Sequence, residues 1–145
     1  IVFHKSRFSV IGKREGANLY LQHNLDSLST NNDYSLKSYR ISEKIEKIQE
    51  TNFNNYIQFE NKDILLVDSL GVYKLNNLIK PSVILQYSPK INLERFIKTI
   101  KPLQIIADGS NYKSYVLRWE KTCLEYQIPF HYTGQKGAYI LKNEY

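Results

Sequence analysis

The second half of the chain alternates short apolar runs with amphipathic stretches. The runs have continuous apolar centres, which is typical of strands that are buried on both faces of a sheet. A short segment of turn residues separates the last two runs of the chain. The strands expected from this pattern span residues 63–69, 81–88, 104–109, 128–133 and, after a turn at 134–137, 138–142.

Two of the intervening stretches repeat apolar residues at steps of three and four, which predicts helices with one buried face. The stretch 92–100 places on one side Leu93, Phe96, Ile97 and Ile100. The stretch 111–126 has a broad aromatic face made of Tyr112, Tyr115, Val116, Trp119 and Cys123. Strands that alternate with helices indicate an α/β fold. We expect a mixed, largely parallel sheet with covering helices and terminal hairpins.

The first half of the chain has a weaker rhythm. Two strand-like runs within residues 8–24 flank the polar turn Lys13–Gly16, which predicts a hairpin. Ile41, Ile45 and Ile48 fit one face of a short helix. The pattern therefore predicts a loop at 26–35, a strand at 36–41, a helix at 42–50 and a break at 51–55.

The composition favours one globular domain. The 145 residues are 42% apolar and 23% charged, and no apolar run approaches the roughly 20 residues that a membrane-spanning helix needs. The chain has no methionine and opens on a strand-like segment, without a basic and then apolar signal sequence. We therefore expect residues 1–145 to be a single soluble domain excised from a larger protein.

The charge changes this picture only slightly. The net charge is +6, and a basic surface attracts polyanions such as DNA or anionic lipid headgroups. The basic residues are spread along the chain, however, with no run of five like charges, so charge alone favours a solvated, lysine-rich surface. Cys123 is the only cysteine, which excludes an internal disulfide and a cysteine-cluster metal site and favours a packed thiol.

The turn Asp108–Asn111 joins a predicted strand to a predicted helix. Ligands of parallel sheets bind beyond the carboxyl ends of the strands, so Asp108 and Asp68, which follows another strand, are weak candidates for holding a divalent metal. The simpler interpretation is structural: Ser110 or Asn111 caps the helix, and Gly109 permits the tight turn. We favour it because caps occur at nearly every helix start, and because the phosphate-binding pattern GxxxxGKS is absent.

The histidines and the aromatic residues give weaker signals. His4, His23 and His131 lie far apart and have no partner at metal-ligand spacing, so we expect partly exposed strand residues. In the helix at 111–126, rings alternate with cations, and such mixtures can stack bases and contact phosphates. The same spacing suits a buried helix face, so we expect Trp119 in the core and a solvated face for Lys113 and Arg118.

Several phrases carry a family resemblance. They are "FHKSRFSVIG", "ILLVDSLGVY", "IIADGSNYKSYVLRWEKTC" and "IPFHYTGQKGAYIL", which occur in this order over most of the chain. The chain resembles the C-terminal domain of the ComEC/Rec2 family of bacterial DNA-uptake channel proteins, and is most similar to the versions found in Bacteroidetes. In many members this domain resembles a metallo-β-lactamase fold and is thought to be a nuclease for the strand that is not imported.

The chain departs from the metal-binding motifs of that family. Asp68 stands near the family's metal-binding aspartate, but the His-x-His-x-Asp-His motif is absent. Where the family has His-His-Gly-Ser, this chain has Gln86, Tyr87 and Ser88, and Lys113 with Ser114 stands at the Gly-His-Pro position. A hydrolytic di-metal site needs several His and Asp ligands. The resemblance therefore implies a trimmed metallo-β-lactamase half with no catalytic residues, no metal and no other cofactor.

The resemblance also implies a setting. We expect the non-catalytic C-terminal domain of an inner-membrane DNA-internalisation channel, on the periplasmic side, guiding DNA or bracing the channel. Its partners would be DNA, the membrane channel portion of the same polypeptide and other DNA-uptake proteins. DNA contacts would be weak, salt-dependent and mainly to phosphates, through Lys90, Lys113, Arg118 and Lys136. The alternatives are a residual metal-dependent phosphoesterase that uses Asp68 and Asp108, and a plain protein-interaction module.

Overall fold

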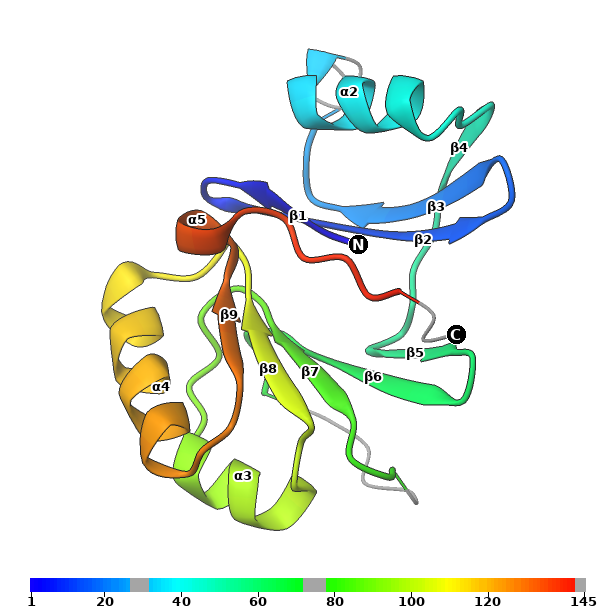
Figure 1. Cartoon of the computed structure of the whole chain (residues 1–145). Coiled ribbons are helices and arrows are strands. Elements are labelled where there is room, and N and C mark those ends of the chain that lie inside the picture. The colour runs from blue at the N-terminus through cyan, green and yellow to red at the C-terminus, as the bar shows by residue number, and fades with distance from the viewer. Residues whose placement is uncertain (27–31, 72–77, 143–145) are drawn as a thin grey trace.

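The computed structural model describes residues 1–26, 32–71 and 78–142, which fold into four layers (Figure 1). A four-stranded sheet, the first sheet, lies next to a five-stranded sheet, the second sheet. Helix α2 covers the outer face of the first sheet, and helices α3 and α4 cover the outer face of the second. The α/β class is therefore confirmed, but the strands form two sheets.

The first sheet consists of β1 (Val2–Lys5), β2 (Phe8–Glu15), β3 (Asn18–His23) and β4 (Lys47–Glu50), in that order. The first three strands pair antiparallel, and β4 pairs parallel to β3. The hairpin predicted within residues 8–24 is confirmed, with a tighter turn than expected. Strand β2 continues to Glu15, and Gly16 takes the left-handed conformation (φ 61°) that the turn requires.

The prediction for residues 36–50 was wrong, because strand and helix are exchanged. Residues 36–41 belong to α2 (Tyr34–Ser42), and the residues expected to form a helix include β4. The Asp33 side chain caps α2 by accepting a hydrogen bond from the Leu36 amide. Ile41 is 79% exposed, so the predicted isoleucine face does not exist. The predicted loop at 26–35 falls partly outside the described residues, and its last two positions lie in α2.

The second sheet has the expected parallel character. Its order is β5 (Tyr56–Phe59), β6 (Lys62–Val67), β7 (Ser82–Leu85), β8 (Gln104–Ala107) and β9 (Phe130–Tyr132). Strands β6 to β9 are parallel, and β5 forms an antiparallel edge. This edge comes from a hairpin in the middle of the chain, since the N-terminal hairpin belongs to the first sheet.

Both predicted helices cover the second sheet. The apolar side of α3 (Leu93–Ile100) is buried as predicted, and Val116, Trp119 and Cys123 of α4 (Lys113–Glu125) join the same core. Burial raises the pKa of the Cys123 thiol to about 12, as suits a packed, unreactive side chain. Alternate residues of β6 to β8 face this core, and the residues between them pack against the first sheet. Burial on both faces explains their continuous apolar runs.

The end of the described chain differs from the prediction. The expected turn forms a short helix, α5 (Thr133–Lys136), and the strand predicted at 138–142 is a single antiparallel bridge between Val2 and Tyr139. These two residues exchange backbone hydrogen bonds of 2.8 and 2.9 Å. The segment then runs between the edges of the two sheets (Figure 1). In the described part of the chain, no helix has the length and apolar character that a membrane crossing needs.

Candidate nucleic-acid interface

The carboxyl ends of β7 and β8 carry a buried polar cluster, the strand-end network, made of Ser9, Gln86, Asp108, Ser110 and Asn111. Asp108 is fully buried directly after β8. One of its carboxylate oxygens accepts hydrogen bonds from the amide and hydroxyl of Ser110, and the other accepts one from the Ser9 hydroxyl on β2. Gln86 Nε2 donates to Ser9 Oγ over 2.7 Å. The network therefore ties the second sheet to the first.

Burial raises the pKa of Asp108 to about 6, although the hydrogen bonds from Ser110 and Ser9 act in the opposite direction. The negative charge of Asp108 also contributes, after burial, to a raised pKa of the nearby Tyr87 hydroxyl. Both carboxylate oxygens of Asp108 are engaged inside the protein. Asp108 therefore orients the turn.

Neither Ser110 nor Asn111 caps α4, so this expectation was wrong. The N-cap residue is Tyr112, which makes no side-chain capping bond. Asn111 instead accepts from the Ser88 amide (2.8 Å) and donates to the Leu85 carbonyl (2.7 Å), and Ser110 Oγ accepts from the Tyr87 amide (2.9 Å). The chain after β7 turns through left-handed conformations, so side chains rather than a strand satisfy its amides.

Gly109 serves the turn through close packing. Its φ lies outside the left-handed region, but a Cβ atom here would lie 2.3 Å from the backbone oxygen of Lys5. The Gly109 carbonyl accepts a hydrogen bond of 2.8 Å from the Arg7 amide. Glycine is required because the turn touches the β1–β2 connection of the first sheet.

The structure does not bring the other metal candidates into one site. Asp68 follows β6, is separated from β8 by β7, and accepts a hydrogen bond from the Leu70 amide. His4, His23 and His131 are partly exposed strand residues, as predicted, and bond to Thr133, Glu50 and Gly137. Within residues 1–26, 32–71 and 78–142, no group of three or more His, Cys, Asp or Glu side chains could hold a metal ion.

A hollow of about 480 Å³ lies between α4 and the start of α3; we call it the α3–α4 hollow. Lys90, Asn92, Tyr115 and Arg118 line it. The Arg118 guanidinium lies over the Tyr115 ring, 4.6 Å from its centroid, which is the geometry of a cation–π contact. Tyr115 in turn packs edge-on against the buried Trp119. The core therefore supports the ring on which Arg118 rests.

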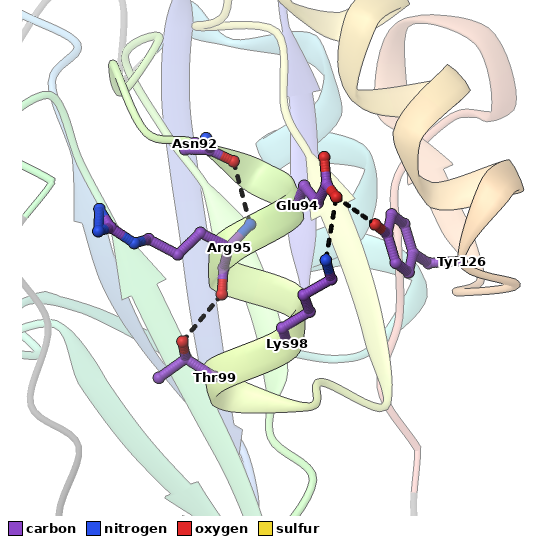
Figure 2. Close-up of polar contacts among 6 residues, drawn as sticks. All are labelled: Asn92, Glu94, Arg95, Lys98, Thr99 and Tyr126. Atoms are coloured by element: carbon purple, nitrogen blue, oxygen red, sulfur yellow. Dashed lines mark hydrogen bonds and ion pairs between the residues drawn. The ribbon is translucent and has the colours of Figure 1, made fainter.

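The carboxylate that lines this hollow, that of Glu94, already has partners within the protein. Figure 2 shows Glu94 between two partners: its Oε1 accepts a hydrogen bond from the Tyr126 hydroxyl (2.5 Å) and one from Lys98 Nζ (3.1 Å). These bonds, with Tyr126 as the larger cause, lower the pKa of Glu94. Lys90 and Arg118, by contrast, have no salt bridge to any acidic residue in the described part of the chain. The hollow thus presents unpaired positive charge.

The four predicted DNA contacts are only partly brought together. Lys90 and Arg118 line the hollow, and Lys113 is exposed in the first turn of the same α4 helix. Lys136 lies on α5, outside the hollow, and its ammonium group donates to the Phe130 carbonyl over 3.0 Å. Sequence reasoning missed the support that Tyr115 gives Arg118. The i, i+3 spacing of these two residues was the signal that could have revealed it.

The comparisons with known proteins gave one match. A family model described as the ComEC C-terminal domain matches residues 1–143. No significant match was found among curated proteins or among solved structures.

Proposed function

Because the chain belongs to the ComEC C-terminal domain family, we propose that it serves DNA uptake as a non-catalytic module that contacts DNA through the α3–α4 hollow. The family supports a role in DNA uptake, and the hollow supplies the chemistry for contact. The contacts would be made mainly to phosphates, so they would carry little sequence information.

One observation carries this proposal: Lys90 and Arg118 share the hollow and have no acidic partner in the described part of the chain. An arginine can bind a phosphate through two parallel hydrogen bonds, and the Tyr115 ring beneath Arg118 limits the freedom of its side chain. Lys113 lies in the first turn of α4 but does not line the hollow. Lys136 contributes less, because its ammonium already donates to a backbone carbonyl.

The absence of catalysis is supported by the state of the strand ends, where a hydrolytic member of the family would hold its metals. The Asp108 carboxylate is buried and binds Ser9 and Ser110. Asp68 binds the Leu70 amide. Neither arrangement directs a free carboxylate towards an ion with a second ligand beside it.

The setting follows from the family, whose members are membrane proteins. We propose that this domain lies on the periplasmic side of the inner membrane, next to the channel portion of the same polypeptide, where it guides DNA or braces the channel beside other uptake proteins. The helix–sheet–sheet–helix layering supports descent from a trimmed metallo-β-lactamase half. The Bacteroidetes type is a proposal that rests on the sequence phrases alone.

Fluorescence anisotropy with a labelled DNA duplex at low salt tests the proposal. We expect weak binding that falls steeply with added salt. The double variant Lys90→Gln/Arg118→Gln should bind at least tenfold more weakly. The double variant Lys37→Gln/Lys47→Gln has the same net charge but changes exposed residues of α2 and β4, and it should bind like the parent. No binding by the parent, or equal losses in both variants, would contradict the proposal.

A nuclease assay with Mn²⁺ addresses the remaining alternative. The non-catalytic proposal predicts no cleavage of single- or double-stranded DNA. Metal-dependent cleavage that is lost in Asp68→Asn or Asp108→Asn would establish the phosphoesterase instead.

A further inference from the structure

An apolar cavity of about 310 Å³ lies between the two sheets, far from the α3–α4 hollow in the layer order of the fold. Its wall is largely aliphatic and comes from both sheets and the C-terminal segment: Ile11, Ile57, Ile64, Ile84, Ile106 and Leu141. The volume is at the lower end of the roughly 300–1,000 Å³ that small-molecule sites occupy. A slender ligand is therefore the best fit.

The wall offers little to water. A buried water needs two to four polar partners, and aliphatic side chains provide none. Two polar side chains of the lining, Ser82 and Tyr139, are already bonded to Gln104: the Ser82 hydroxyl accepts from Gln104 over 3.0 Å, and the Tyr139 hydroxyl donates to Gln104 over 2.8 Å. Apolar cavities of this kind take apolar guests.

The mouth of the cavity has the opposite character. The lining has four charged side chains, Lys13, Arg14, Lys142 and one carboxylate, Glu43, and all four are at least partly exposed, so we take this side as the mouth. Arg14 binds Glu43 over 2.6 Å, and Lys13 pairs with Glu15 outside the lining. Lys142 is exposed and has no salt bridge in the described part of the chain. The mouth therefore carries an excess of positive charge next to an aliphatic interior.

We propose that this cavity binds a single aliphatic chain with a negatively charged head, such as a fatty acid. The chain lies among the isoleucines between the sheets. The head remains at the mouth, where Lys142 and the neighbouring cations offset its charge. This site is independent of DNA contact, because it uses the opposite face of the second sheet.

Methyl NMR of the isoleucine-labelled protein tests the proposal without any substitution. Decanoate, added below its micelle concentration, should shift the methyl signals of Ile57, Ile64 and Ile84. The signals of Ile41 and Ile79, which are exposed and outside the cavity, serve as the control and should stay in place. Absence of shifts at millimolar decanoate, or larger shifts at the two exposed residues, would overturn the proposal.

Two further experiments test whether the ligand needs a negatively charged head. Decyltrimethylammonium has the same chain length and the opposite charge, and it should bind at least tenfold more weakly than decanoate. Lys142→Gln should weaken decanoate binding roughly three- to tenfold, whereas Lys37→Gln, on α2, should leave it unchanged. Equal binding of the two amphiphiles, or equal effects of the two substitutions, would overturn the assignment of an anionic ligand.

Discussion

The strand-end network and the α3–α4 hollow lie on the same sheet but treat charge in opposite ways. At the strand ends, Asp108 is buried and both of its carboxylate oxygens accept hydrogen bonds from inside the protein. At the hollow, Lys90 and Arg118 are exposed, and neither has a salt bridge in the described part of the chain. The first region ties the two sheets together, and the second leaves its cations exposed, where we propose that DNA binds.

The comparison shows that a position at the end of a parallel strand does not by itself make a residue part of a ligand site. Strand ends of parallel sheets are the usual place for ligands, and the turn after β8 has the strand–turn–helix shape of such a site. In this chain the turn is filled by its own side chains. Substitutions at the network should therefore change stability, and substitutions at the hollow should change DNA affinity.

The largest effect is expected from Asn111→Ala. The change leaves the buried Ser88 amide and Leu85 carbonyl without their side-chain partner. Each buried group that loses its partner costs roughly 1–3 kcal/mol, so we expect the free energy of unfolding in urea to fall by roughly 2–4 kcal/mol. A loss below about 1 kcal/mol would show that the network does not hold the fold.

Asp108→Asn should remove a pH dependence of stability. Asp108 keeps its proton up to a pKa of about 6 in the folded protein and releases it near 3.8 when unfolded. The folded state therefore binds more protons between these values, so Asp108 makes stability fall as pH rises from about 4 to about 6. At 1.36 kcal/mol per pKa unit, the unfolding free energy that Asp108 removes over this pH range is on the order of 3 kcal/mol. Urea unfolding of the parent and the Asp108→Asn variant across this pH range measures this free energy. If the difference in stability between the two proteins stayed constant with pH, the prediction would be wrong.

Asn92→Ala provides a matched comparison with Asn111→Ala. Asn92 also precedes a helix, but it is exposed and caps α3 by accepting a hydrogen bond from the Arg95 amide (3.0 Å; Figure 2). Loss of an exposed cap typically costs about 1 kcal/mol. Urea unfolding should show this smaller loss. If both alanine variants lost equal stability, burial would not distinguish the two regions.

The smallest effect is expected from Tyr126→Phe. This change removes the shorter of the two hydrogen bonds that Glu94 accepts and leaves its carboxylate freer to repel phosphates. DNA affinity in the anisotropy assay should fall about two- to threefold, as expected for an exposed charge. The double variant Tyr126→Phe/Glu94→Gln should recover the loss. Failure to recover would mean that Tyr126 acts by another route.

Sequence patterns predicted the β2–β3 hairpin of the first sheet and strands β6 to β9 of the second, but they missed β5 and exchanged strand and helix in residues 36–50. The apolar runs of β6 to β8 and the periodic faces of α3 and α4 are strong local signals, because these elements are buried on known sides. Strand β4 forms only because it pairs with β3, in which Leu19 stands beside Ile48. This pairing spans more than twenty residues, so a local pattern cannot reveal it.

The same distinction applies to the candidate site. Lys90 and Arg118 were predicted individually, but the hollow that joins them depends on how the connection after β7 packs on α4. Ser9 was not predicted at all, because it reaches Asp108 from β2, 99 positions away in the sequence. The functions of Ser110 and Asn111 were misassigned for a related reason: their partners lie after β7 rather than in α4.

The most direct test of the account is an amide NMR titration of the ¹⁵N-labelled protein with a short DNA duplex at low salt. We expect shifts at Lys90 and Arg118 and through the first turns of α3 and α4. The amides of Ser9, Gln86 and Asp108 should remain in place. Shifts concentrated at the strand-end network, with none at Lys90 and Arg118, would contradict the central claim that DNA binds at the α3–α4 hollow.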